Sequence, residues 1–159
     1  MNLHFSRLSL LVLGLGLLVS VSSTGQQPAA KPYHEGSVWD IAFIHVKAGM
    51  EDRYMRYLAD EWKREHEALK SAGYILNYKV ITTEAHAAQD FNVILMTEFK
   101  DLASMEANAD KMEAAALQLI GGEQKMEVGY EERGTYRDVI GDRVGREMIL
   151  TPKAATATK

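Results

Sequence analysis

The stretch VWDIAFIHVKAGMEDRYMRYLADEWKREHEAL, residues 38–69, carries the pattern from which the fold is predicted. Its first part, 38–46, places apolar residues on both alternating faces of a strand, so we expect both faces of the sheet to be covered. Gly49 ends the strand, and Glu51 and Asp52 stand where carboxylates favour a helix N-terminus. The helix is predicted to continue to residue 72, with an apolar stripe formed by Met55, Leu58, Trp62 and Leu69.

The rest of the chain repeats this unit with one more strand between the copies. Strands are predicted at 74–83 and 91–99, a helix follows Asp101 as its N-cap, and a short last strand covers 144–150. Gly121 and Gly122 are expected to stop or bend that helix, and 123–141 suggests short helical pieces. The order predicts an α+β, ferredoxin-like βαββαβ domain: a four-stranded antiparallel sheet with helices on one face. The bare apolar face predicts a homodimer.

Two segments resemble the dimeric α/β barrel superfamily. The first is the strand ending in HVKAGMED, which resembles the entry to the first helix in that superfamily, and the second is the third strand running through FKDLASME into the second helix. The likeness covers 38–150 and implies the fold and the dimer. It implies no single activity, because the superfamily includes cofactor-independent monooxygenases, isomerases, haem enzymes and stress proteins. Sites in such folds usually lie in the cleft between sheet and helices.

The two ends of the chain differ from this domain. Arg7 precedes the apolar run 8–19 and small residues follow, which is the pattern of a secretory signal peptide, assigned to 1–25. We expect a linker at 26–37, the domain at 38–150 and a disordered tail at 151–159. This predicts a secreted or periplasmic protein without stable membrane insertion after cleavage. The alternative is an uncleaved N-terminal anchor.

Composition excludes several classes of function. The chain of 159 residues has a net charge of −4 and no basic stripe, which argues against nucleic acid as a partner. It has no cysteine, so thiolate metal sites and thiol nucleophiles are excluded. His45, His66 and His86 lack the spacing of a metal site, and His66 is interpreted as solvated. No metal and no cofactor is predicted.

Two residues are candidates for proton transfer. Glu65 interrupts the apolar stripe of the first helix, and burial would raise the pKa of its carboxyl group as a general base or acid requires. Its alternative role is to border the buried face as half of an ion pair, with Glu61 as the fallback candidate. His45 shares a strand face with Trp39 and Phe43, where it is either a catalyst in the cleft or a core histidine bonded to a neighbour.

A ligand site is predicted from aromatic and polar residues around the same cleft. Tyr54, Trp62 and Tyr78 offer broad faces for a small apolar molecule, and Asn92 and Arg146 are candidate polar contacts. The alternative is ordinary core and interface. Arg133, Arg137, Arg143 and Arg146 either hold an anion or form surface ion pairs with the acidic residues among them. Three functions stay open: binding of a small apolar molecule, a cofactor-independent monooxygenase or isomerase, and an envelope interaction module without a ligand.

Overall fold

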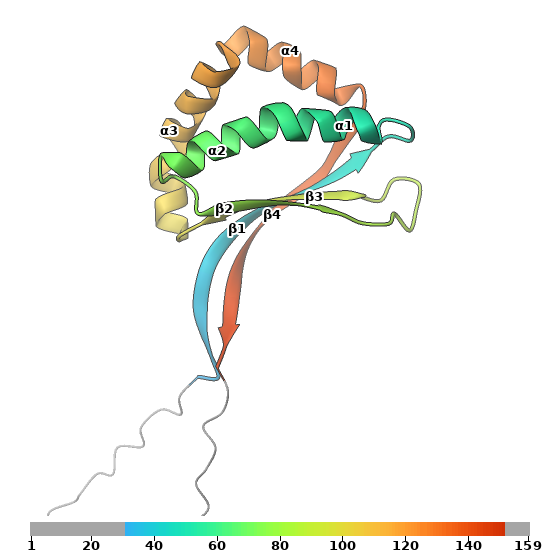
Figure 1. Ribbon diagram of the computed structural model, residues 1–159. Helices are drawn as coiled ribbons and strands as arrows, with labels where there is room; N and C mark the ends of the chain where they lie inside the picture. Colours follow the sequence, from blue (N-terminus) through green and yellow to red (C-terminus); the bar gives the residue numbers. More distant parts are fainter. Residues whose placement is uncertain (1–30, 152–159) are drawn as a thin grey trace, which may run out of the picture. The chain divides into compact units, whose positions relative to one another are not determined.

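The computed structural model describes residues 31–151, and the order of elements is the predicted one with an additional helix. Figure 1 shows the helices gathered on one side of the sheet, which confirms the ferredoxin-like α+β architecture. The elements are β1 (Tyr33–Val46), α1 (Glu51–Tyr57), η1 (Leu58–Trp62), α2 (Lys63–Ser71), β2 (Asn77–Thr82), β3 (Val93–Phe99), α3 (Leu102–Ile120), α4 (Glu123–Gly134) and β4 (Arg137–Leu150).

The four strands form one antiparallel sheet in the order β2-β3-β1-β4, so β1 is central as expected for this fold. In β1, Ile44 and Val46 are 2% exposed and pack with Tyr54 and Leu58 under the helices. A second cluster of Val38, Leu69, Ile75 and Phe99 fills the other end. The core therefore lies wholly between the sheet and the helices.

The opposite face of the sheet, the open face, is not covered by any helix of residues 31–151 (Figure 1). Because side chains alternate along a strand, the neighbours of the buried residues point to this face. They are half-buried in the single chain although no other layer covers them. The apolar members on the two central strands are Trp39, Ile41, Phe43, Ile94 and Met96.

Strands β1 and β4 begin earlier than the sequence predicted. β1 starts at Tyr33, within the segment interpreted as a linker, because Tyr33, His34 and Glu35 pair with Leu150, Ile149 and Met148 of β4. β4 starts at Arg137 and covers residues read as helical pieces. The linker assignment is therefore corrected for 33–37: these residues form a β1–β4 arm that extends past β3 (Figure 1). The predicted signal peptide at 1–25, the rest of the predicted linker at 26–30 and the predicted tail at 152–159 lie outside the described residues.

The first helix contains a π-helical turn, η1, between α1 and α2. Four residues along this helix are buried and follow one another at intervals of four positions: Tyr54, Leu58, Trp62 and His66. In a regular α-helix each such step rotates the side chain by about 40° away from the previous one. The wider π-turn takes up part of this rotation and keeps the row facing the sheet.

The break between α3 and α4 follows from two glycines. Gly121 and Gly122 have φ of 95° and 109°, which side chains with a Cβ rarely adopt, so α3 ends there as predicted. Asp101 caps α3 by accepting a hydrogen bond from the Ser104 backbone N–H at 2.7 Å. Within residues 31–151, no helix has the length and apolar character that crossing a membrane requires.

Candidate functional site

A cavity of about 270 Å³, the inner cavity, lies between the sheet and the helices. The sheet forms its floor with Ala42, Ile44, Leu95 and Val139, and the other walls come from α1, η1, α2, the end of α3 and α4. Its volume is slightly below the roughly 300 Å³ at which pockets for drug-sized ligands begin, so it suits a small molecule. The lining residues whose side chains bear polar atoms are Tyr54, Tyr57, Glu61, Trp62, Arg64, Glu65, His66, Tyr130, Arg133 and Arg137.

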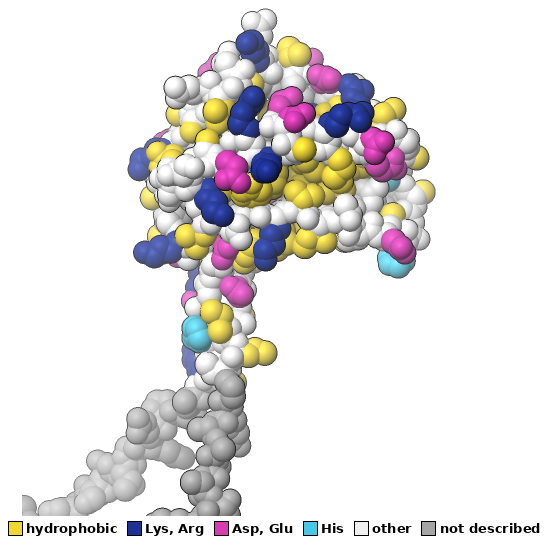
Figure 2. Space-filling view, in the orientation of Figure 1, with side chains coloured by type: hydrophobic (Ala, Val, Ile, Leu, Met, Phe, Trp, Pro, Cys, Tyr) yellow, Lys and Arg dark blue, Asp and Glu magenta, His cyan; other side chains and the backbone are white. Residues whose placement is uncertain are grey.

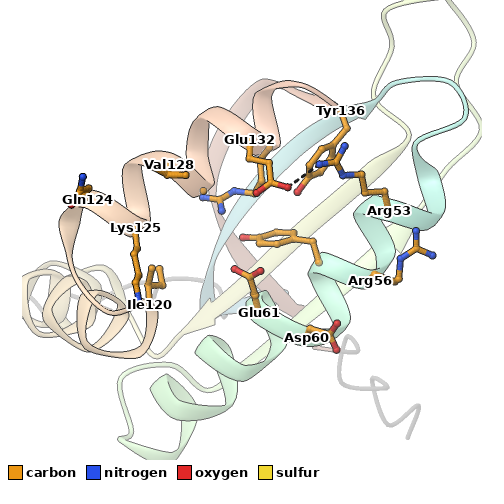
Figure 3. Close-up of a pocket in the computed structure, with 13 residues that line it drawn as sticks. Arg53, Arg56, Asp60, Glu61, Ile120, Gln124, Lys125, Val128, Glu132 and Tyr136 are labelled. Carbon is orange, nitrogen blue, oxygen red and sulfur yellow. Dashed lines mark hydrogen bonds and ion pairs between the residues drawn. The ribbon is translucent and has the colours of Figure 1, made fainter.

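A second hollow of about 590 Å³, the outer groove, runs between the helices on the solvent side (Figure 3). Its charged groups are mostly exposed, and Arg53 bonds Glu132 at 2.8 Å across it. Tyr57, Glu61, Ile120 and Arg133 line both the groove and the inner cavity. The outer groove therefore has the character of ordinary polar surface, and the two spaces share a wall.

Arg133 in that wall is a buried cation without a buried counter-ion. Its residue exposure is 8%, and its guanidinium lies over the rings of Tyr57 and Tyr130 at 4.9 and 4.5 Å from their centroids. Its Nε has no hydrogen-bond partner, and no carboxylate of residues 31–151 lies within 4.0 Å of it. The cation–π contacts offset part of the desolvation cost of the guanidinium but leave Nε without an acceptor.

Two further donors at the inner cavity are unpaired. The Nε of Arg137 and the hydroxyl of Tyr54 are buried and lack a partner, and the Arg137 guanidinium lies 5.8 Å from the Tyr54 ring centroid. Burial raises the pKa of Tyr54, and it raises the pKa of Tyr57 to about 12, so both phenols keep their protons at neutral pH. The three buried atoms without a partner at the inner cavity, Arg133 Nε, Arg137 Nε and the Tyr54 hydroxyl, are therefore all able to donate a hydrogen bond.

Glu65 lines the inner cavity, as its position in the apolar stripe predicted. Burial raises the pKa of its carboxyl group, while the charge of Arg133 acts in the opposite direction. Neither this carboxylate nor that of Glu61 forms an ion pair within 4.0 Å among residues 31–151. A half-buried carboxyl group beside a cavity has the properties of a proton donor or acceptor.

The raised pKa of Glu65 gives a prediction for stability. A carboxyl group whose pKa is raised by folding contributes stability fully below its ordinary value of 4.5, and this contribution is lost as the pH rises through the raised pKa. The wild-type protein should therefore lose stability between pH 4 and pH 8, whereas Glu65→Gln has no carboxyl group to titrate there. We expect the unfolding free energy of the variant to exceed that of the wild type by more at pH 8 than at pH 4. Urea denaturation at both values measures this. A Glu113→Gln control on the exposed surface of α3 should show no such difference, and a gain independent of pH contradicts the prediction.

His66 was interpreted as solvated, and this was wrong. It is 8% exposed, stacks on Trp62 with ring centroids 3.8 Å apart, and lines the inner cavity. Its Nδ1 donates to the Trp62 carbonyl at 2.9 Å, so its Nε2 accepts from the Thr97 hydroxyl at 3.1 Å when the ring is neutral. Burial lowers the pKa of His66, which favours this neutral form.

The structure places His45 away from the helix–sheet cleft. It lies on the open face of β1, because its neighbours Ile44 and Val46 point into the core under the helices. Its Nδ1 lies 2.7 Å from the Asp90 carbonyl, which only a ring N–H can satisfy. His45 therefore cannot transfer a proton in the helix–sheet cleft, and the alternative of a histidine bonded to a neighbour describes it.

Of the predicted ligand-binding residues, Tyr54 and Trp62 line the inner cavity and three others do not. Tyr78 packs edge-on against Trp62 and donates its hydroxyl to Glu67. Asn92 joins the loop before β3 to β1, donating to the Val46 carbonyl at 3.0 Å and accepting from its N–H at 2.8 Å. Arg146 pairs with Glu35 on the β1–β4 arm. These three side chains are used for structure.

Comparison with known proteins adds little about function. No protein-family model matches the chain, and no curated protein matches its sequence. Solved structures that it resembles include HapK from Hahella chejuensis, with 12% identity over 75% of this chain and 99% of that one and a TM-score of 0.48. A NipSnap family protein of unknown function from Agrobacterium tumefaciens has 11% identity over 76% and 95%, with a TM-score of 0.44. A dimeric ferredoxin-like protein from an uncultured marine organism has 10% identity over 77% and 95%, with a TM-score of 0.48.

The fold of this chain is ferredoxin-like. Its strand order and its helices on one face show this without reference to the comparisons. Among residues 31–151 there is no group of three or more acidic or histidine side chains able to hold a metal ion. Function must therefore be argued from the inner cavity itself.

Proposed function

We propose that this protein binds a small, mainly apolar molecule in the inner cavity, and that it does so as an exported homodimer. The observation that carries the proposal is a cavity with an apolar floor at whose edges α1, α4 and β4 place buried polar groups without partners. Pockets of this composition, apolar with a few convergent polar groups, are the usual form of small-molecule sites. Each unpaired buried donor destabilises the folded protein, so such donors are not expected around a space that serves packing alone.

An apolar patch lies on the surface between the first helix and β2. Figure 2 shows apolar side chains gathered between the first helix and β2, with charged side chains around them. The apolar floor of the inner cavity lies on the same side of the sheet as these helices. No residue of β2 lines the inner cavity, so this patch is a separate apolar surface.

The homodimer is proposed from the open face. Its apolar residues on β1 and β3 are half-exposed in the single chain, and large contiguous apolar surface on a soluble protein is typical of an interface. The same face of a second copy is self-complementary under two-fold symmetry. Export is proposed from the signal-like residues 1–25, which lie outside the described residues.

The binding proposal is tested with Trp62 as a reporter. Trp39→Phe removes the open-face tryptophan and leaves Trp62, at the wall of the inner cavity, as the one indole of this chain. The neutral probe para-bromophenylacetamide carries a heavy atom that quenches indole fluorescence on contact. We expect saturable quenching of this variant, confirmed by isothermal titration calorimetry of the wild-type protein.

Filling the inner cavity should remove this binding. Ala42→Phe adds a ring at the cavity floor, whereas Ala103→Phe adds the same ring on the exposed face of α3 and is the matched control. We expect the first change to weaken probe binding at least about tenfold and the control to leave it unchanged. Equal binding by all three proteins would place the probe elsewhere and contradict the proposal.

A second candidate function is proton transfer to or from the bound molecule. It is favoured by Glu65, whose carboxyl group lines the inner cavity with a pKa raised by burial. Neutral His66, with its ring held at Nδ1 and Nε2, would contribute a fixed wall to such a site. Glu65→Gln separates the two functions, because it should abolish turnover of any substrate and leave binding of the neutral probe unchanged.

A further inference from the structure

We infer that the ligand of the inner cavity carries an acidic group, a carboxylate or a comparably charged oxyanion, and that Arg133 and Arg137 bind it. This inference rests on the proposed function and specifies the class of ligand. It adds an acidic group to the predicted small apolar molecule, and for these two arginines it favours the alternative of holding an anion over that of surface ion pairs. Arg143 and Arg146, the other members of that set, are exposed and lie outside the inner cavity.

The first argument is the kind of group left unpaired. The Nε atoms of Arg133 and Arg137 and the hydroxyl of Tyr54 are buried at the inner cavity, and each can donate a hydrogen bond. A cluster of unused donors is complemented by an acceptor, and arginine donors fit a carboxylate best. A neutral hydrocarbon would leave all three unsatisfied.

The second argument is the charge around the inner cavity. The charged residues that line it are Arg64 and Glu65 from α2, Glu61 from η1, Arg133 from α4 and Arg137 from β4. No two of them form an ion pair within 4.0 Å, and Arg64 and Glu61 are exposed to water. The buried charge is therefore carried mainly by the two arginines, and Glu65 offsets it only in part.

The third argument is that α4 is shaped to hold the Arg133 guanidinium. Gly129 lies one turn earlier in α4, where a Cβ atom would come within 2.9 Å of Nη1 of Arg133. Glycine inside a helix is destabilising relative to alanine, and here it makes room for the cation. With the rings of Tyr57 and Tyr130 beside it, the guanidinium is positioned before any ligand arrives.

The experiment compares two probes that differ in charge alone: para-bromophenylacetate and its neutral amide, para-bromophenylacetamide. Titration calorimetry of the wild-type protein at pH 7.5 should give an affinity for the acid about ten- to hundredfold higher than for the amide, as expected for charge-assisted hydrogen bonds. Arg133→Met should remove most of this preference and leave binding of the amide unchanged. Arg143→Gln, on the same strand as Arg137 but on the open face, is the matched control and should behave as wild type.

Stability separates ligand recognition from a structural role for Arg133. Removing an unpaired buried cation should leave the melting temperature of Arg133→Met equal or higher, whereas a structural arginine would lower it. Gly129→Ala is a second variant that keeps the charge, favours the helix and displaces the guanidinium, so it should also weaken binding of the acid.

The outcomes distinguish this inference from the proposed function. Tight binding of the acid that is lost in Arg133→Met and reduced in Gly129→Ala supports it. Equal affinity for acid and amide, with no effect of Arg133→Met, overturns the inference and leaves binding of an apolar molecule in place. Failure of both probes to bind overturns the proposed function and the inference together.

Discussion

Phe99→Ala is expected to lower the free energy of unfolding by about 3–5 kcal/mol, the largest effect on stability predicted for a single side chain. Phe99 is 3% exposed at the end of β3 and packs with Val38, Leu69 and Ile75, away from the inner cavity. Truncation removes the apolar contacts of its ring and leaves a void that the neighbouring helix and strands cannot close. Urea denaturation followed by circular dichroism measures the change.

Leu102→Ala is the control for this prediction. Leu102 stands three residues later, at the start of α3, and is 41% exposed, so its truncation should change the free energy of unfolding by less than about 0.5 kcal/mol. Similar losses in the two variants would show that the second core cluster does not stabilise the fold as the contacts indicate.

Ile41→Lys is expected to weaken self-association at least about a hundredfold, because it would bury an unpaired charge at the proposed two-fold interface. Ile41 lies on the open face of the central strand β1, opposite Met96 of β3 and Arg143 of β4. The new lysine would stand beside an arginine, and a second copy would bring another such pair against it. Sedimentation velocity across micromolar concentrations measures the equilibrium.

Val128→Lys supplies the matched control on the helix side of the molecule. Val128 is 57% exposed on α4, so the same change of side chain there should leave the wild-type equilibrium unaltered. Sedimentation of the wild-type protein as a monomer at every concentration would contradict the homodimer. A variant of Ile41 that stays dimeric would place the interface elsewhere.

The topology could be predicted because it depends on local patterns. Gly49, Gly121 and the Asp101 cap marked the ends of elements, and the apolar stripe around Leu58 and Trp62 gave the buried face of the first helix. The early start of β1 was not predicted, because Tyr33 to Glu35 contain no apolar alternation. Their strand conformation comes from pairing with the end of β4, a contact distant in sequence.

The candidate site was predicted in part. Glu65, Tyr54 and Trp62 lie at the inner cavity because helical spacing placed them on the buried face. The phase of a strand is harder to assign, since β1 is apolar on both faces and the sequence does not say which one the helices cover. The face that carries His45 could therefore not be predicted from the sequence.

The burial of Arg133 and His66 was harder to predict from the sequence than the position of the apolar stripe. Both residues stand among charged neighbours, in a pattern typical of a solvated helix surface. What could have indicated Arg133 is Tyr130 one turn before it, whose ring the guanidinium covers. For His66, the π-turn that keeps it in the buried row with Trp62 has no recognisable sequence pattern here.

The most direct test of the account is to observe the unpaired arginine N–H groups themselves. Proton–nitrogen correlation spectra of the arginine Nε–H groups, assigned with Arg133→Met and Arg137→Gln, should be recorded while para-bromophenylacetate is added. We expect the signals of Arg133 and Arg137 to shift downfield with a common dissociation constant, while that of Arg143 stays in place. Saturation of the protein by the probe without any shift of those two signals would contradict the account.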